Sequence, residues 1–226
     1  MKLSNDTREV LKNFSTINQN LLVKNGTVIG TMSAMKNIVA KATVPDNFNN
    51  EFAIYDLNEF LSVVSMFDSP VLKFDPNMKF VSIVDGKRSV KYFFSDTSIL
   101  TSPSKDITMP PTELKFTLSA DELNTLRKAA SALGVTDVVV SPSSNGGVTA
   151  QVTDIKDSTS NAFSIELDAK EIPSDTFNFV FNINNFKVLA GDYEVAVSSK
   201  LISHFKNTGA EVEYYIALEK SSSFGE

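Results

Sequence analysis

The chain has 226 residues, no cysteine, a single histidine (His204) and a formal net charge of -6. At roughly 150 residues per domain, this length suits one large domain or two smaller ones, and either can bury a core. The composition excludes a disulfide framework, a thiolate metal site and a cluster of histidine ligands, and we predict no metal or cofactor.

No segment has the features of an export signal or a membrane-spanning helix. The N-terminal stretch MKLSNDTREV lacks the apolar core of a signal peptide. No run approaches the ~18 apolar residues that a membrane helix requires. We therefore expect a soluble protein of the cytoplasm, where the absence of cysteine also fits the reducing conditions.

The charge is unevenly distributed along the chain. Residues 1–108 contain 12 Lys and Arg against 11 Asp and Glu, whereas residues 109–226 contain 9 against 16. An acidic total disfavours binding to nucleic acid, because phosphate repels it. The imbalance fits either attraction between subunits or ordinary variation between domains.

The first predicted helix follows Leu3 and Ser4, and Ser4 or Asp6 can serve as its cap. Its apolar residues recur at helical spacing on one face: Val10, Leu11, Phe14 and Ile17. At about 100° per residue, Arg8 and Lys12 fall on the opposite face.

Strand signals dominate the segments that follow. Asn-Gly or Asp-Gly pairs occur in KNGT (24–27), VDGKR (84–88) and SNGGV (144–148). Such pairs supply the positive φ of tight hairpins, so we expect antiparallel hairpins in both halves.

A strand that leads directly into a helix is predicted in the first half. Phe52 and Ile54 alternate as in a strand, after which the apolar spacing becomes helical: Leu57, Phe60, Leu61 and Val64. This second helix, 57–66, contains no Lys or Arg.

Residues 95–114, SDTSILTSPSKDITMPPTEL, separate the two halves. The segment has three prolines and no sustained periodicity, which is typical of a connector that runs over the surface. We place the domain boundary near residue 110.

The third predicted helix follows Leu118 and Ser119. Its apolar stripe has the same character as that of the first helix: Leu123, Leu126, Ala130 and Leu133. Asp121 and Glu122 suit the positive end of the helix dipole. Lys128 points away from the stripe, and Arg127 flanks it.

A second strand-to-helix switch is predicted near residue 182. Phenylalanines alternate at 177, 179 and 181, and helical spacing follows: Ile183, Phe186, Leu189 and Ala190. Lys187 flanks Phe186 on this fourth predicted helix.

The elements therefore repeat. The first helices of the two halves are 115 residues apart and the second helices 126 apart, so the second half has gained about eleven residues. A duplication predicts an α+β fold with two topologically similar domains, 1–110 and 111–226, each built of strand, helix and hairpins. Two unrelated α+β domains remain the alternative.

Few residues in the sequence suit a catalytic site. His204 lies beside Ser203, but no acidic residue that would orient it is evident in the sequence, so we interpret it as a surface histidine. The chain has no phosphate-binding loop, dinucleotide fingerprint or paired-histidine metal motif. We expect that it is not an enzyme.

Several segments resemble one known family. They are KLSNDTREVLKNFSTIN at the start, FAIYDLNEFLSVVSMF in the middle, and FNFVFNINNF, GDYEVAV and YYIALE towards the end. In this order, over essentially the whole chain, they resemble the sliding clamps of T-even-type bacteriophages. The resemblance implies the DNA-clamp fold: a ring of three copies, each with two similar domains, whose helices line the hole and whose sheets form the outer wall.

The same resemblance implies a function. The ring would encircle duplex DNA in the cytoplasm of the infected bacterial host and tether the phage DNA polymerase to its template. The residues that would face the DNA are Arg8, Lys12, Arg127, Lys128 and Lys187. They would attract phosphates through water without reading sequence.

Ring closure requires a head-to-tail interface between identical copies. By resemblance, an edge strand of one domain meets an edge strand of the neighbour's other domain. We expect the strand around Val90, Tyr92 and Phe94 to meet the strand around Phe163 and Ile165. The alternative is that both segments are interior strands.

The resemblance also implies protein partners: the polymerase, the clamp-loading ATPase and late-transcription factors, which would dock by short apolar tails. Candidate contacts in the connector are Leu100, Ile107 and Met109. These side chains could instead anchor the connector to its own domain.

Two other classes of function remain open. One is a structural or virion assembly protein built from duplicated β-rich domains that never contact DNA. The other is an enzyme that acts through unrecognised carboxylates, which would require a deep pocket with perturbed acids.

Overall fold

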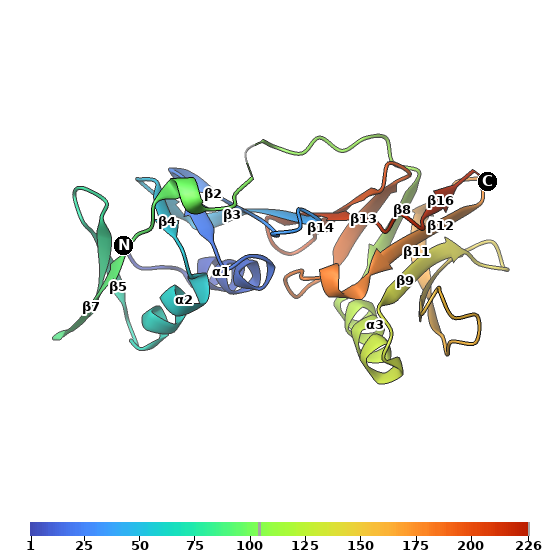
Figure 1. Cartoon of the computed structure of the whole chain (residues 1–226), viewed down its shortest axis with the longest axis horizontal. Helices are drawn as coiled ribbons and strands as arrows, with labels where there is room; N and C mark the ends of the chain where they lie inside the picture. Colours follow the sequence, from blue (N-terminus) through green and yellow to red (C-terminus); the bar gives the residue numbers. More distant parts are fainter. Residues whose placement is uncertain (104, 226) are drawn as a thin grey trace. The chain divides into compact units, whose positions relative to one another are not determined.

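A computed structural model describes residues 1–103 and 105–225 and divides the chain into two compact units, Met1–Asp106 and Ile107–Glu226 (Figure 1). Each unit combines helices with antiparallel sheet, which confirms the predicted α+β class. The order of elements is also shared: a helix, four strands, a second helical segment and an antiparallel three-stranded meander.

The first unit has two α-helices and two sheets among its described residues (Figure 1). Its elements are α1 (Asn5–Ile17), β1 (Leu21–Val23), β2 (Gly26–Met32), β3 (Ile38–Phe48), β4 (Phe52–Ile54), α2 (Leu57–Ser65), β5 (Val71–Phe74), β6 (Phe80–Asp85), β7 (Arg88–Phe93) and the 3-10 turn η1 (Thr97–Ile99). One sheet has the order β3-β2-β1-β4, and the other has the order β5-β6-β7.

The start of α1 is tied to the sheet. Ser4 caps the helix by accepting a hydrogen bond from the Thr7 amide at 3.1 Å, and its own amide and hydroxyl both donate to Asp46 Oδ2 on β3 at 2.8 Å. Partial burial alone would raise the pKa of Asp46, but hydrogen bonds from Thr7 and Ser4 and the charge of Arg8 hold that pKa below its usual value.

The predicted apolar faces of the first two helices form the core of the first unit. α1 packs against β3 and α2, and its buried residues are Thr7, Val10, Leu11, Phe14 and Ile17. On α2 the buried residues are Leu57, Phe60 and Val64. Both helices lie within a residue of their predicted bounds, so the periodicity identified them correctly.

The second unit has one α-helix among its described residues, and a long sheet (Figure 1). Its elements are β8 (Leu114–Leu118), α3 (Ala120–Leu133), β9 (Asp137–Pro142), β10 (Val148–Thr153), β11 (Phe163–Glu171), β12 (Phe177–Asn182), the 3-10 turn η2 (Ile183–Asn185), β13 (Tyr193–Ser198), β14 (Ile202–Asn207), β15 (Val212–Ala217) and β16 (Ser223–Phe224). The strand order is β16-β12-β9-β10-β11-β8-β13-β14-β15.

Helix α3 is capped at both ends. Ser119 and Glu122 form a capping box, in which each side chain bonds the backbone amide of the other residue. Gly134 ends the helix at φ 69°, a left-handed conformation that suits glycine. Leu126 of α3 lies with Phe181, Phe186 and Phe205 around one small internal cavity, so the helix covers an aromatic core.

The fourth predicted helix is wrong. Residues from Ile183 form only the single turn η2, and Phe186 leaves helical geometry at ψ 52°. Phe186 and Val188 are both buried, and a spacing of two matches an extended chain rather than a helix face. Backbone groups of Leu189 are instead held by the hydroxyls of two buried tyrosines, Tyr193 and Tyr214.

Gly191 completes this irregular segment. Its φ is +144°, and a Cβ at this position would lie 2.6 Å from Asn207 Nδ2. Both the backbone conformation and the close approach therefore require glycine.

Replacing Gly191 with alanine should lower the free energy of unfolding by about 3–5 kcal/mol, because backbone strain and the overlap with Asn207 add. Gly134→Ala is the matched control, since its Cβ would meet nothing within 4 Å at φ +69°, and it should cost about 1–2 kcal/mol. Urea denaturation measures both. Equal losses would show that Asn207 yields to the new methyl group.

Candidate nucleic-acid interface

The outward face of α1 presents one lysine directly to solvent. Lys12 is exposed and lies opposite the buried stripe of the helix. Arg8 is only partly exposed, because its guanidinium donates to the Leu3 carbonyl at 3.3 Å and its Nε is buried without a hydrogen-bond partner. Of the two cations that we predicted to face DNA on this helix, Arg8 therefore also makes a contact within its own unit.

Helix α2 adds no cation, as the sequence predicted. Asp56 caps it by accepting from the Glu59 amide at 3.0 Å, and Glu59 lies exposed in the first turn. The Tyr92 hydroxyl donates to the Asp56 carbonyl at 3.1 Å. The positive potential of the first unit's helices thus depends on α1.

Helix α3 repeats the arrangement of α1 with two neighbouring cations. Lys128 is exposed and opposite the buried stripe, whereas Arg127 is half-buried and its guanidinium donates to the Phe186 carbonyl. Burial lowers the pKa of Arg127, and the nearby Tyr193 acts in the opposite direction. Arginine keeps its charge at neutral pH in either case. Arg127 therefore ties α3 to the segment that replaced the predicted fourth helix.

Lys187 is exposed in the extended segment after η2, not on a helix as the sequence predicted. The site prediction thus separates into three outward lysines and two arginines that also hold the fold. Sequence periodicity predicted the helix face of the residues on α1 and α3, but it could not show that a carbonyl lies within reach of each guanidinium.

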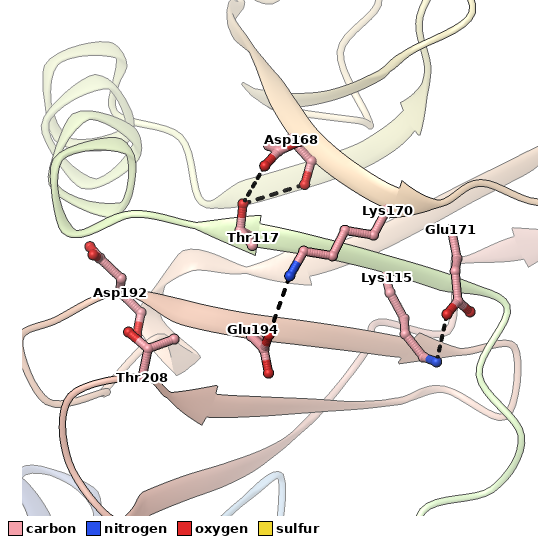
Figure 2. A network of polar contacts seen from close by, with 8 residues as sticks. All are labelled: Lys115, Thr117, Asp168, Lys170, Glu171, Asp192, Glu194 and Thr208. Carbon is pink, nitrogen blue, oxygen red and sulfur yellow. Dashed lines mark hydrogen bonds and ion pairs between the residues drawn. The ribbon is translucent and has the colours of Figure 1, made fainter.

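The sheet of the second unit presents a different surface, on the face away from its core. Figure 2 shows ion pairs between Lys115 and Glu171 at 3.0 Å and between Lys170 and Glu194 at 3.3 Å. Thr117 also donates to the Asp168 carboxylate at 3.3 Å. Four of the eight residues drawn are carboxylates and two are lysines, and the exposed Lys206 lies opposite Glu194 on the neighbouring strand, so this surface carries a small excess of negative charge that would weakly repel phosphate.

Strand β7 lies at the edge of its sheet, where it pairs with β6. Tyr92 packs on Phe60 with ring centroids 5.3 Å apart. Phe94 follows the end of the strand and stacks on Phe52 at 4.8 Å. Tyr92 and Phe94, two of the predicted interface side chains, thus pack within the first unit.

Strand β11 has a divided edge. Residues 163–167 pair with β10, while the partners of β8 are Asp168, Ala169 and Glu171 on the other side. The half of β11 that contains Phe163 and Ile165 therefore has no partner along its β8 side among the described residues. It is neither an ordinary edge strand nor a fully interior one.

The connector is anchored to the first unit over its first part. Asn18 Nδ2 donates to the Thr101 carbonyl at 3.2 Å, and Lys41 pairs with Asp106 at 3.0 Å. The predicted partner contacts Leu100, Ile107 and Met109 are all partly exposed.

His204 has an acidic neighbour that the sequence did not reveal. Glu213 Oε2 lies 2.9 Å from His204 Nε2, and the imidazole stacks on Tyr215 with centroids 4.8 Å apart. Both partners come from β15, the strand beside it, so linear spacing could not place them. Ser203 faces the opposite side of β14, where its buried hydroxyl donates to the Ile216 carbonyl, so the two side chains form no catalytic dyad.

Two kinds of site are absent from the described residues. No three His, Cys, Asp or Glu side chains among residues 1–103 and 105–225 are grouped so that they could hold a metal ion. Over the same residues, no helix is both long and apolar enough to cross a bilayer.

Comparison with known proteins places the chain in a family. Residues 4–93 match the family model described as DNA polymerase processivity factor, and residues 115–220 match the model described as gp45 sliding clamp, C terminal. A sliding clamp of Vibrio phage KVP40 is 32% identical over 225 residues, which are 97% of this chain and 99% of the relative. The chain belongs to the sliding-clamp family of DNA polymerase processivity factors.

Two further relatives agree. The sliding clamps of Escherichia phage RB69 and Enterobacteria phage T4 are 30% and 28% identical, each over 99% of both chains. These relatives confirm the resemblance to phage clamps and the processivity role. The family is non-enzymatic, so the expectation that the chain is not an enzyme is also confirmed.

Solved structures confirm the predicted fold. The proliferating cellular nuclear antigen (PCNA) of Entamoeba histolytica aligns with a TM-score of 0.69 at 14% identity over 94% of both chains. A structure of A. fulgidus PCNA bound to the C-terminal region of FEN-1 aligns with a TM-score of 0.70 at 14% identity over 96% of both chains. At this identity the likeness shows the DNA-clamp fold alone.

The different environments of Arg127 and Lys128 predict different effects on stability. Arg127→Ala should lower the free energy of unfolding by about 1–3 kcal/mol, because the Phe186 carbonyl loses a charged donor. Lys128→Ala should change it by less than about 0.5 kcal/mol. Thermal or urea unfolding of the two variants measures the difference. If Arg127→Ala left the free energy of unfolding unchanged, the guanidinium would not hold the 183–191 segment.

Proposed function

We propose that this chain forms a ring of three copies that encircles duplex DNA and tethers the phage DNA polymerase for processive replication. The observation that carries the proposal is the match of two clamp family models to the two halves in order, together with relatives aligned over nearly the whole chain. The two clamp domains of each copy are 1–110 and 111–226.

Attraction to DNA in this proposal is weak and independent of sequence. Lys12 and Lys128 supply exposed charges that meet phosphates through water, and the exposed Lys187 adds positive potential. Arg8 and Arg127 contribute positive potential while they hold their helices in place. Because neighbouring phosphates offer equivalent contacts, the ring can slide.

Retention on DNA comes from topology rather than affinity. A closed ring cannot leave a long duplex sideways, so a polymerase bound to it stays at high effective concentration near the primer end. The acidic outer surface of the second unit discourages binding of DNA outside the hole.

In this proposal, the ring closes through two strand edges, one on β7 and one on β11. Strand β7, with Val90, Tyr92 and Phe94, adds to the unpaired half of β11, with Phe163 and Ile165, of the next copy. Backbone hydrogen bonds across such an edge join sheets without a large contact area. A head-to-tail contact of this kind closes when its rotation completes a circle, here after three copies.

The ring also serves as a mobile platform. We propose that the polymerase, the clamp-loading ATPase and late-transcription factors attach by short apolar tails near Leu100, Ile107 and Met109 of the connector. The FEN-1 segment bound to A. fulgidus PCNA is a C-terminal region, which fits attachment by chain ends. All of these events take place in the cytoplasm of the infected host.

Encirclement predicts a topological signature. Protein loaded by a clamp loader onto circular DNA should stay bound through gel filtration at high salt, and cutting the DNA once should release it, because the ring then slides off an end. Native mass spectrometry should show three copies. Release that is unaffected by linearisation would favour a structural protein that binds from outside.

The outward lysines predict a separable defect. Lys12→Glu combined with Lys128→Glu should reduce loading on DNA by roughly tenfold at low salt, because two phosphate-attracting charges per copy are reversed, while the trimer stays intact. The matched control reverses two exposed lysines on strands, Lys73→Glu on β5 with Lys206→Glu on β14. A free trimer that dissociates in the first variant, or an equal loss in the control, would contradict the assignment.

A further inference from the structure

Strand β7 has two chemically distinct faces. Val90 and Tyr92 are partly covered and lie on the core side, whereas Lys91 and Phe93 lie on the outer side. Phe93 is 66% exposed, a large value for an apolar side chain in a strand. Lys91 Nζ lies 4.2 Å from the centroid of the Phe80 ring on β6, so this ring contact holds the ammonium over the outer face.

The unpaired half of β11 has the complementary pattern. Phe163 and Ile165 are partly covered and Leu167 is buried on one face, whereas Ser164 and Glu166 are exposed on the other. The Glu166 carboxylate accepts a hydrogen bond from Asn145 Nδ2 at 2.8 Å, which limits the positions it can take. Alternation therefore places three apolar residues inward and one carboxylate outward.

One antiparallel register satisfies both faces when β7 adds to β11. It places Phe94 opposite Phe163, Tyr92 opposite Ile165 and Val90 opposite Leu167 on the inner face. On the outer face, Phe93 then lies opposite Ser164 and Lys91 opposite Glu166. Directly opposed residues have Cβ atoms about 5 Å apart, close enough for an ion pair.

The neighbouring registers of β7 on β11 are less favourable. A shift by one residue turns every side chain of β7 to the other face and would bury Lys91. A shift by two in one direction sets Lys91 opposite Ser164 and loses the ion pair. A shift by two in the other direction needs the edge from Asp168 onward, which β8 already occupies.

We propose that Lys91 of one copy pairs with Glu166 of the next copy and that this pair fixes the register of the ring interface. The proposal rests on the proposed ring and names the residues that select its pairing. The occupant of the β7 edge is thus a second copy of this chain. An apolar inner seam supplies burial, and a single outer ion pair supplies specificity.

Charge around the two strands favours the same pairing. The segment 71–93 contains five Lys and Arg against two Asp, whereas the segment 137–171 contains six Asp and Glu against two Lys. Opposite net charges of this kind speed the encounter of two copies and discourage contact between like edges. They also make assembly dependent on salt, since exposed charges are screened within about 8 Å at physiological ionic strength.

Charge exchange tests the pair in the full-length protein. Lys91→Glu and Glu166→Lys should each raise the protein concentration at half-dissociation by roughly tenfold at low salt, and the double exchange should return it to within about threefold of the starting protein. Sedimentation equilibrium measures this concentration. Matched controls are Lys73→Glu, on the same outer face at the far edge of the sheet, and Glu211→Lys, in an exposed turn; neither should change assembly.

The absence of native cysteine allows a direct test of register. Lys91→Cys with Glu166→Cys should form a disulfide between copies under mild oxidation, since directly opposed Cα atoms lie within the usual 4.4–6.8 Å range. Lys91→Cys with Ser164→Cys, offset by two residues, should cross-link poorly because diagonal pairs lie about 7–8 Å apart. Denaturing gels would then show covalent trimers for the first variant only.

The outcomes separate this proposal from the ring itself. A starting protein that is monomeric at every concentration overturns both. A starting protein that forms trimers and is retained on circular DNA, while the double exchange is no better than the single reversals or the offset cysteines cross-link equally well, overturns only the pair. If the β7 edge bound a different protein segment in place of β11, no disulfide would form between copies, and this result would also overturn the pair.

Discussion

The proposed assembly depends on two strand edges, on β7 and on the first half of β11, that have no sheet partner among residues 1–103 and 105–225. The outer side of β7 and the first half of β11 each present amides and carbonyls that would pair with any extended segment. Proteins normally protect such edges, so an open edge flanked by apolar residues fits the proposed contact with a second copy. In the ring that we propose, each copy would offer one edge of each kind, so every such edge would be covered.

The division of charge follows from the same plan. The first α-helix of each unit directs one exposed lysine away from the core, Lys12 on α1 and Lys128 on α3. On the sheet surface of the second unit, Lys115 and Lys170 are instead paired with carboxylates. An acidic protein can therefore act on DNA, because attraction is needed on one surface and repulsion is useful on the other.

Periodicity in the sequence predicted the elements that pack by repeating contacts. α1, α2 and α3 were predicted correctly because their buried residues recur at helical spacing. The prediction of a helix after Asn182 was wrong because its four apolar residues fit helical spacing by chance, while tyrosines from β13 and β15 hold the backbone in another conformation. The inward bonds of Arg8 and Arg127 and the Glu213 partner of His204 also come from distant parts of the chain.

The central claim is that three copies enclose a channel through which duplex DNA passes. A cryo-electron microscopy structure of the protein assembled on DNA tests it most directly. The account predicts a closed ring with a channel wider than B-form DNA, sheets continuous from β7 of one copy to β11 of the next, and Lys12 and Lys128 lining the hole. A compact particle without a channel, or a ring with these lysines on its outer wall, would contradict it.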